Sequence, residues 1–428
     1  MKTSLENTLM WACDNFQIYR EDLERFIDFE SGRLDFSKIS AFDMHRAMRP
    51  VTKDDLLKRI KPYLAADDDY VAEVTRSSGT SGLQSIKIRS SYELALMKEA
   101  LTSKNRFQQT EIILQFINAY HGVGVTVDPS LYVQVDVSSK ASVFSGIGML
   151  LKNFDLPRAK SRINSIVGSV NNVLQFTAYL EHLGISSDQF SIESVACSGS
   201  YLSDNSARKI SNYWGIEPTN FFSLSEFRGV AYICPKCGAL QFTSNIIPFA
   251  INLTNDAPLE RGYGRLCVTE VLPFGLCQPL IKYLSGDLVE VIDDPCCELH
   301  RGNIRRVGRI SDCVFHPDDS ASVLLTSQDL YEAVDIKEVL REEVWLNYVD
   351  ELPSKFFGQP LARAFSERNN GLRVVVEINV DAGNKLDVCQ KVYDRLMQRS
   401  ATLRSEVAKK NVSLCVCVND KLFSGLKK

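Results

Sequence analysis

The sequence lacks long apolar runs and an excess of positive charge, and each absence excludes a class of protein. No window holds eighteen or more uninterrupted apolar residues, so no transmembrane helix is predicted. The 428 residues carry a formal net charge of −4. That charge offers no general attraction to nucleic acid or to an anionic membrane. We therefore predict that neither is a partner.

A secretory signal is also missing. Residues 1–22 carry charges throughout and have no apolar core of the kind that signal peptides contain. We expect a cytoplasmic protein, in which most of the 12 cysteines are reduced thiols or metal ligands rather than disulfides. Internal repeats and low-complexity tracts are absent as well. The length favours two or three domains, and the oligomeric state stays open, a homodimer included.

The alternation of helical and strand-like patterns predicts an α/β fold. Residues 1 to about 70 read as helical, with a helix expected to begin at Thr52, an N-cap followed by acids in the first turn. From about 90 to 245, helical patterns alternate with apolar runs such as 131–135 and 194–197, which favours an α/β sheet. Short β-runs then fill residues 246–307.

A final module reads as strand, helix, strand over residues 372–378, 388–409 and 412–418. The predicted organisation is therefore a large N-terminal α/β domain over residues 1–309, in which about 246–307 form a β-rich subdomain. A small, mobile α+β C-terminal domain over residues 310–428 completes it.

The first chemical signal is a run of six small residues, Ser77, Ser78, Gly79, Thr80, Ser81 and Gly82. A loop of this composition can bring backbone N–H groups and hydroxyls close to phosphate oxygens, because glycine permits tight turns and no bulky Cβ blocks the approach. A surface linker is the alternative.

Further signals follow in order along the chain. They are Phe222-Ser223-Leu224-Ser225-Glu226, then Gly286-Asp287-Leu288, then Gly308-Arg309, and a lysine-bearing tail over residues 420–428. Each alone has an ordinary explanation as a surface acid, a turn, an ion-pair partner or a frayed end.

In this order and spacing the motifs resemble the adenylate-forming superfamily of carboxylate–AMP ligases, and within it the phenylacetate–CoA ligase branch. The run at 77–82 is similar to that family's Ser-Ser-Gly-Thr-Thr-Gly loop, with Ser81 in place of a threonine. The segment ending in Glu226 is similar to its aromatic-x-x-Thr-Glu motif, with Ser225 keeping the hydroxyl. Five ordered motifs are far more specific than one glycine loop.

The resemblance implies an ATP-dependent ligase that forms an acyl-adenylate and then transfers the acyl group. By resemblance the loop at 77–82 holds the β- and γ-phosphates, and Glu226 binds Mg²⁺ with Ser225 beside the α-phosphate. Asp287 accepts hydrogen bonds from the ribose and Arg309 adds a cationic donor. Lys427 is the expected catalytic lysine, acting with Glu226 and Arg309, and Lys421 and Lys428 are alternatives.

The chain departs from the family pattern at three places. The segment Ser198-Gly199-Ser200-Tyr201 occupies the place of the adenine- or acyl-binding loop but lacks its Gly-Gly-Glu. Ser311 replaces the first aspartate of the hinge motif, and residues 314–326 hold no Arg-Gly turn of the kind that shapes a pantetheine tunnel. The resemblance implies CoA as the default acceptor, and the missing turn keeps a carrier-protein thiol or an amine as alternatives. An aromatic or heteroaromatic acid is expected from the resemblance alone.

Cysteine spacing predicts a structural zinc site. Cys234 and Cys237 form a C-x₂-C knuckle with proline and glycine in the turn. About sixty residues later come Cys296, Cys297 and His300. The two knuckle thiolates, one of Cys296 and Cys297, and the imidazole would complete a closed Cys₃His tetrahedron. Buried reduced thiols are the alternative.

A noncatalytic descendant is the second hypothesis, namely a zinc-stapled fold that binds a nucleotide or a partner protein. Ser311 and the uncertain terminal lysine favour it. Retention of the loop at 77–82 with Glu226, Asp287 and Arg309 argues against it, because an inert scaffold has no physical need for that set.

Overall fold

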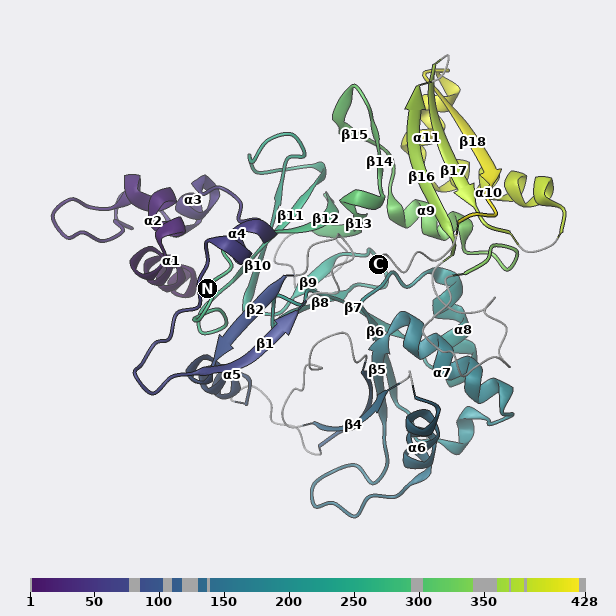
Figure 1. The fold of residues 1–428 in the computed structure, drawn as a ribbon, viewed down its shortest axis with the longest axis horizontal. Coiled ribbons are helices and arrows are strands. Elements are labelled where there is room, and N and C mark those ends of the chain that lie inside the picture. Colours follow the sequence, from purple (N-terminus) through teal and green to yellow (C-terminus); the bar gives the residue numbers. More distant parts are fainter. Residues whose placement is uncertain are drawn as a thin grey trace. The chain divides into compact units, whose positions relative to one another are not determined.

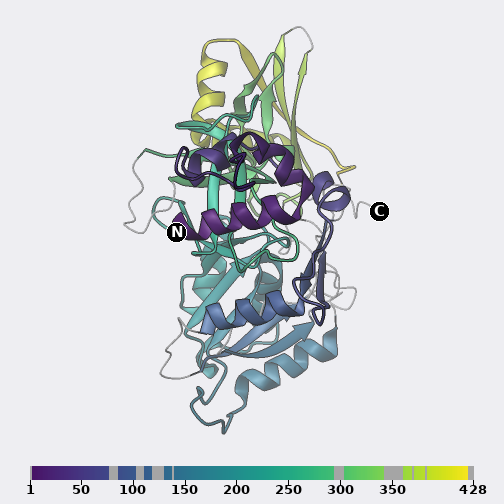
Figure 2. The same cartoon turned by 90° about the vertical axis from the view of Figure 1, so that its left-hand side faces the viewer.

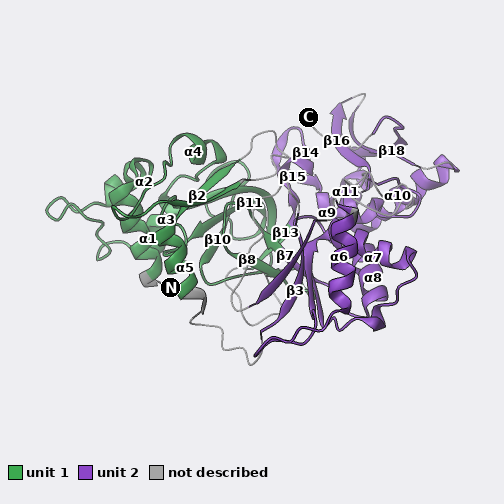
Figure 3. Cartoon of the chain, turned by 60° about the horizontal axis from the view of Figure 1, so that its bottom comes forward, with its two compact units in different colours: residues 1–107, 120–129, 222–306 green, residues 108–119, 130–221, 307–428 purple. Residues whose placement is uncertain are grey.

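The computed structural model describes residues 2–76, 85–102, 110–117, 130–136, 139–293, 303–341, 360–368, 371–380 and 383–422. Contacts divide the chain into two compact units (Figure 3). Unit 1 comprises residues 1–107, 120–129 and 222–306, and unit 2 comprises residues 108–119, 130–221 and 307–428. This partition differs from the predicted boundary at residue 309, and the predicted movement of the C-terminal domain stays a prediction.

Unit 1 begins with short amphipathic helices (Figure 1). They are α1 (Lys2–Asn15), α2 (Gln17–Leu23), the 3₁₀ turn η1 (Glu24–Phe26), α3 (Ala41–Ala47) and α4 (Lys53–Lys58). The predicted helix start at Thr52 is confirmed. Its side chain accepts the N–H of Asp55, and the Asp55 carboxylate accepts the N–H of Thr52, which makes a capping box.

These helices pack on an antiparallel sheet. Its strands are β10 (Ile246–Ile251), β11 (Gly262–Glu270), β12 (Tyr283–Val291) and β13 (Ile304–Arg309), adjacent in that order. Leu5 and Leu9 of α1 share one buried core with Leu266 and Val268 of β11, and Figure 2 shows α1 beside the N-terminus. The strands within residues 246–307 agree with the short β-runs that the sequence predicts, and the bounds of the subdomain stay a prediction. The packing partners of these strands are the N-terminal helices, more than 180 residues earlier in the chain.

Two hairpins complete unit 1. Strands β1 (Val71–Arg76) and β2 (Ile86–Ser90) pair antiparallel, and α5 (Ser91–Thr102) follows at once. Strands β8 (Val230–Ile233) and β9 (Leu240–Phe242) also pair antiparallel. The first hairpin leads into the predicted phosphate loop, and the second carries the predicted zinc knuckle.

Unit 2 contains the parallel sheet that the alternating pattern predicts. Its strands run in the order β4 (Leu131–Asp136), β3 (Ile112–Ile117), β5 (Ser165–Ser169), β6 (Ser194–Ser198) and β7 (Thr219–Ser223), all parallel. The connecting helices are α6 (Lys140–Leu151), α7 (Val170–His182), η2 (Ser187–Gln189) and α8 (Asp204–Trp214). Because helices cover this sheet, its strands are apolar, and Leu114, Ile166 and Val195 are fully buried.

The C-terminal part of unit 2 is an α+β module. It contains η3 (Ile310–Asp312), the hairpin of β14 (Val314–His316) and β15 (Asp319–Leu325), and α9 (Ser327–Val334). A sheet of β16 (Ala362–Arg368), β17 (Leu372–Ile378) and β18 (Val412–Val418) follows, with α10 (Lys385–Arg399) and α11 (Ala401–Ala408) between its last two strands. Among the described helices, none combines the length and the apolar character needed to cross a membrane.

The prediction of one helix over residues 388–409 is wrong. Ser400 separates α10 from α11 with extended backbone angles, φ −91° and ψ 102°. Its hydroxyl oxygen accepts the N–H of Leu403 and its O–H donates to the carbonyl of Leu324. A buried serine that caps a new helix and bonds a neighbouring strand therefore competes with helix continuation.

Candidate functional site

The carboxylate of Glu226 lies in a pocket of hydroxyl groups within unit 1. Ser85 Oγ donates to Oε1 at 2.5 Å, Tyr283 Oη donates to the same oxygen at 3.0 Å, and Ser225 Oγ donates to Oε2 at 3.1 Å. Glu226 is only 7% exposed. Among the described residues, every donor to this carboxylate is thus a neutral hydroxyl. A buried carboxylate without a counter-charge is costly, so the arrangement suits an incoming cation.

Strand pairing brings the flank of the predicted phosphate loop to Glu226. The last pair of the first hairpin joins Arg76 to Ile86, so the end of β1 and the start of β2 lie side by side. Ser85 is the described residue between these two strands that meets Glu226. The predicted loop residues Ser77, Ser78, Gly79, Thr80, Ser81 and Gly82 lie outside the described residues, as does Lys427.

A β-bulge sets the direction of Asp287. Gly286 has φ +78°, and the register between β11 and β12 shifts between Arg265 and Cys267. Bulges of this kind re-aim a side chain. The Asp287 carboxylate has no exposed surface, and its Oδ1 accepts from Arg306 Nε at 2.8 Å.

Arg306 also connects Asp287 to the aromatic residue of the other motif. Its guanidinium lies 5.5 Å from the centre of the Phe222 ring, a cation–π contact. Tyr283, which holds Glu226, lies four residues before Asp287 on β12. Asp287, Arg306 and Phe222 therefore form one connected group of side chains in unit 1, and β12 carries both Asp287 and the Tyr283 that bonds Glu226. Ser223, at the end of β7, is exposed.

Gly308 and Arg309 lie at the end of β13 in unit 2. Gly308 has φ +138°, and a Cβ built on it would lie 1.5 Å from Ser327 Oγ. Only glycine fits this close approach. Arg309 is exposed and precedes η3, in which Ser311 Oγ donates to Asp312 at 2.9 Å.

The segment Ser198-Gly199-Ser200-Tyr201 follows β6 and is tied to the C-terminal module of unit 2. Gly199 has φ +76°, and the N–H of Ser200 donates to the carbonyl of Ser198. Tyr201 Oη donates to Glu332 Oε1 at 3.0 Å. Burial, with the nearby negative charge of Glu332, raises the pKa of Tyr201 above its ordinary value.

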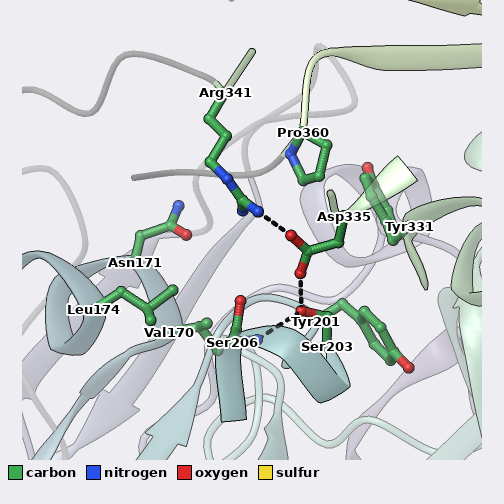
Figure 4. A pocket seen from close by; sticks show the side chains of 10 residues that line it. All are labelled: Val170, Asn171, Leu174, Tyr201, Ser203, Ser206, Tyr331, Asp335, Arg341 and Pro360. Atoms are coloured by element: carbon green, nitrogen blue, oxygen red, sulfur yellow. Dashed lines mark hydrogen bonds and ion pairs between the residues drawn. The ribbon is translucent and has the colours of Figure 1, made fainter. Parts of the chain in front are cut away.

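A small pocket next to this segment is occupied by the protein's own ion pair. Figure 4 shows Asp335 between Arg341 and Ser203, and it bonds to both. Tyr331 and Pro360 also line the pocket. Asp335 and Arg341 are both buried, and their charges pair with each other. The pocket is therefore polar, and the protein itself supplies the partner of each charge. None of the residues that line it belongs to the group around Glu226.

The described half of the predicted zinc site has the shape of a knuckle. Cys234 and Cys237 lie between β8 and β9, with Gly238 N–H donating to the Cys234 carbonyl at 2.8 Å and Gly238 at φ +73°. Cys296, Cys297 and His300 lie outside the described residues. Within the described part of the chain, no three metal-ligating side chains gather.

The ends of the segment that bears those residues are anchored near the knuckle. The N–H of Ile292 donates to the carbonyl of Asn303 at 2.7 Å, which closes the connection between β12 and β13. Arg305, two residues later, bridges Ala239, the second residue after Cys237. The described backbone therefore brings the flank of the second cluster to the first.

Sequence reasoning missed Ser85, Tyr283 and Arg306. Each contacts a motif residue across 19 to 141 positions of sequence. The only signal was proximity to a motif, since Ser85 follows the small-residue loop and Tyr283 precedes Gly286 by three positions.

Comparison with known proteins identifies the fold. No model of a protein family matches the chain, and no curated protein sequence matches it. Solved structures do match. An open conformation of 2-hydroxyisobutyryl-CoA ligase in complex with 2-HIB-AMP and CoA aligns over 98% of this chain and 87% of its own, with 13% identity and a TM-score of 0.63. The same ligase in the postadenylation state with R3-HIB-AMP gives a TM-score of 0.60 at 13% identity, over 99% of this chain and 87% of its own.

A second ligase is also similar. ATP-bound MatB from Rhodopseudomonas palustris aligns over 82% of this chain and 64% of its own, with 13% identity and a TM-score of 0.52. The chain therefore has the adenylate-forming enzyme fold, which confirms the predicted fold class. Nothing in these comparisons distinguishes the phenylacetate–CoA ligase branch.

Proposed function

We propose that this chain is an ATP-dependent ligase that converts a carboxylic acid to an acyl-adenylate and passes the acyl group to a thiol. The fold supports this, because the similar structures include ligases bound to an acyl-AMP, CoA or ATP. One observation carries the proposal. The Glu226 carboxylate is buried among neutral hydroxyls, beside the hairpin end that leads into residues 77–82.

The first half-reaction forms one bond and breaks one. An oxygen of the substrate carboxylate attacks the α-phosphorus of ATP, the bond to pyrophosphate breaks, and negative charge builds on the phosphoryl oxygens. Catalysis of such transfers is mainly positioning and charge stabilisation. Glu226 would hold Mg²⁺, with Ser225 beside the α-phosphate and residues 77–82 around the β- and γ-phosphates. The metal ion, when bound, neutralises part of the phosphate charge.

The second half-reaction passes the acyl group from AMP to the acceptor. The acceptor's sulfur attacks the acyl carbonyl and AMP leaves. We propose CoA as the acceptor. A carrier-protein thiol or an amine is the alternative, because the Arg-Gly turn expected of a CoA ligase is absent from the sequence of β14 and β15. In this scheme residues 310–428 turn about the hinge at Arg309, and Lys427 acts in the adenylation state.

The identity of the acid is an open part of this proposal. An aromatic or heteroaromatic acid follows from resemblance to the phenylacetate–CoA ligase branch, whereas the similar ligase binds the adenylate of a small hydroxy acid. A test panel therefore needs both kinds of acid. A cytoplasmic location and a homodimer also remain predictions.

Structural zinc is part of the proposal for unit 1. Cys234 and Cys237 would supply two thiolates, with His300 and one of Cys296 and Cys297 completing the tetrahedron. The anchoring of Asn303 and Arg305 beside the knuckle supports it. A closed site of this kind leaves no position for a substrate, so its role would be to fasten β13 to the β8–β9 hairpin.

Two observations favour a noncatalytic nucleotide-binding protein as the second candidate. Ser311 stands where the ligases of the resemblance carry an aspartate, and Asp287 is fully buried against Arg306 rather than open to a ribose. ATP binding without turnover would be the signature of this alternative.

Pyrophosphate exchange into ATP separates the two candidates. The wild-type chain is assayed with Mg²⁺ and a panel of aryl, heteroaryl and small hydroxy acids, beside Glu226→Gln and the control Glu290→Gln, a half-buried carboxylate of the same unit paired with Arg305. We expect acid-dependent exchange, lowered about 100-fold in Glu226→Gln and retained in the control. ATP binding with no exchange for any acid would establish the noncatalytic candidate instead.

A further inference from the structure

A network of buried and partly buried charged side chains surrounds the turn that carries Glu226. We call it the charge network. Its members are Glu73 of β1, Lys87 and Arg89 of β2, Glu93 of α5, Glu270 of β11, and Arg228, which precedes β8. Lys87 and Arg89 are each 1% exposed. Lysine and arginine are rarely buried to this extent, and buried ion pairs add little net stability. Their burial therefore points to a geometric role rather than to a gain in stability.

Arg89 holds the backbone of Glu226. Its Nη2 donates to the Glu226 carbonyl oxygen at 3.1 Å, and its Nη1 donates to Glu73 Oε1 at 3.1 Å. Its Nε lies 3.6 Å from Glu93 Oε1. A guanidinium is planar, so these directions are fixed relative to one another. One side chain thus joins β1, β2 and α5 to the Glu226 turn.

Glu270 holds the same turn from its other flank. Its Oε1 accepts the N–H of Arg228, two residues after Glu226, at 3.0 Å. Lys87 Nζ lies 4.0 Å from Glu270 Oε2, and the Arg228 side chain pairs with Glu73. The carbonyl of Glu226 and the N–H of Arg228 are therefore both bonded to buried charges.

We propose that Arg89 and Glu270 are positioning residues, which fix the orientation in which the Glu226 carboxylate binds the metal–nucleotide complex. This inference rests on the proposed function. Arg89 and Glu270 touch the Glu226 turn only through its backbone, so they set the direction in which its side chain leaves the chain. Through the charge network they also couple the orientation of Glu226 to β1 and β2, the strands on either side of residues 77–85. Groups that orient a metal ligand typically change metal affinity about 10- to 100-fold when removed.

The test measures Mn²⁺ binding in the presence of ATP by electron paramagnetic resonance on the full chain. The variants are Glu226→Gln, Arg89→Lys and the two combined. Arg265→Lys is the matched control, because Arg265 lies on β11 and binds Asn252, Asn255 and Asp256 rather than the Glu226 turn. Lysine keeps the positive charge of Arg89 but lacks the planar guanidinium group that bonds several partners at once. We expect Arg89→Lys to weaken binding about 10- to 100-fold, with the control unchanged.

The double variant decides whether Arg89 acts through Glu226. If it does, Arg89→Lys weakens wild-type binding but adds nothing once Glu226 is glutamine, because residues that act as a unit are not additive. If the losses of Mn²⁺ affinity in the two single variants add in the double variant, the inference is overturned. A loss in Glu226→Gln without one in Arg89→Lys also overturns it and leaves the proposed function standing. No loss in Glu226→Gln overturns the metal site itself and the inference with it.

Glu270 supplies an independent pair of variants if Arg89→Lys does not fold. Glu270→Gln keeps an acceptor for the Arg228 N–H and is expected to bind Mn²⁺–ATP as the wild type does. Glu270→Met removes the acceptor and is expected to lose affinity as Arg89→Lys does. Equal affinities in these two variants contradict the positioning role.

Discussion

At the residue scale, one buried imidazole ties the stability of unit 1 to pH. His45 is 1% exposed, and its Nε2 lies 2.7 Å from Thr269 Oγ1. That hydroxyl oxygen already accepts the N–H of Lys282 at 2.8 Å, so its proton is available to the imidazole. Burial lowers the pKa of His45 to about 3, and the positive charges of Lys282 and Arg46 act in the same direction.

The sign of the pH effect follows from that shift. Between about pH 6.5 and 3 the unfolded chain binds a proton at His45 and the folded chain does not, so stability falls as pH falls through this window. Relative to His45→Gln, the wild type should lose about 1.4 kcal/mol per pH unit between these limits. Urea unfolding at a series of pH values measures it. Parallel stability curves for the two proteins would contradict it.

Asp287 carries the second prediction at this scale. Asp287→Asn keeps the size of the side chain but removes the charge that would accept ribose hydroxyls, so ATP affinity should fall about 10-fold. Calorimetric titration with ATP measures the affinity, and thermal unfolding checks the fold, since Arg306 loses its charged partner. Asp256→Asn, at a half-exposed pair with Arg265, is the control. Unchanged ATP affinity would remove Asp287 from the ribose site.

At the scale of elements, the sequence patterns correctly predicted the features that depend on interactions between residues close together in the chain. The capping box at Thr52 forms from residues three positions apart, and the strands of the α+β module follow their apolar runs. The break at Ser400 was missed, because the local cap on Leu403 acts together with a buried bond to Leu324, 76 positions away. The partners Ser85 and Tyr283 of Glu226 were missed for the same reason. Long-range pairing leaves no periodic trace in a single sequence.

The break between α10 and α11 predicts a specific loss of stability. Ser400→Ala removes both the cap on α11 and the buried bond to β15, and should cost about 1–2 kcal/mol. Ser405→Ala, at an exposed position of α11, should leave stability nearly unchanged or raise it slightly, since alanine favours helix. Equilibrium unfolding of the two variants compares them directly. Equal effects would mean that Ser400 is not a structural cap.

At the scale of the whole molecule, unit 1 is assembled from distant pieces of chain. The N-terminal helices and the β10–β13 sheet share one core, although more than 180 residues separate them. Composition and periodicity predicted both pieces but not their association, because a shared core depends on shape as well as apolar character. The proposed zinc would add a second fastening within the same unit.

Metal analysis tests the proposed zinc site. We expect about one zinc per chain, and Cys237→Ser should lose the metal and lower the unfolding temperature of the protein, because a structural zinc contributes directly to folding. Cys389→Ser, a half-buried thiol of α10, should keep it. A chain without zinc whose stability does not respond to a chelator would dismiss the site.

The most direct test of the central claim follows an oxygen atom from the acid into AMP. With a substrate acid found by exchange and labelled with ¹⁸O in its carboxyl group, attack on the α-phosphorus followed by acyl transfer leaves one labelled oxygen on AMP. Mass spectrometry of the released AMP should therefore show a gain of one ¹⁸O, and Glu226→Gln should release about 100-fold less of this labelled AMP. Label in inorganic phosphate, or AMP without label, would contradict an acyl-adenylate mechanism.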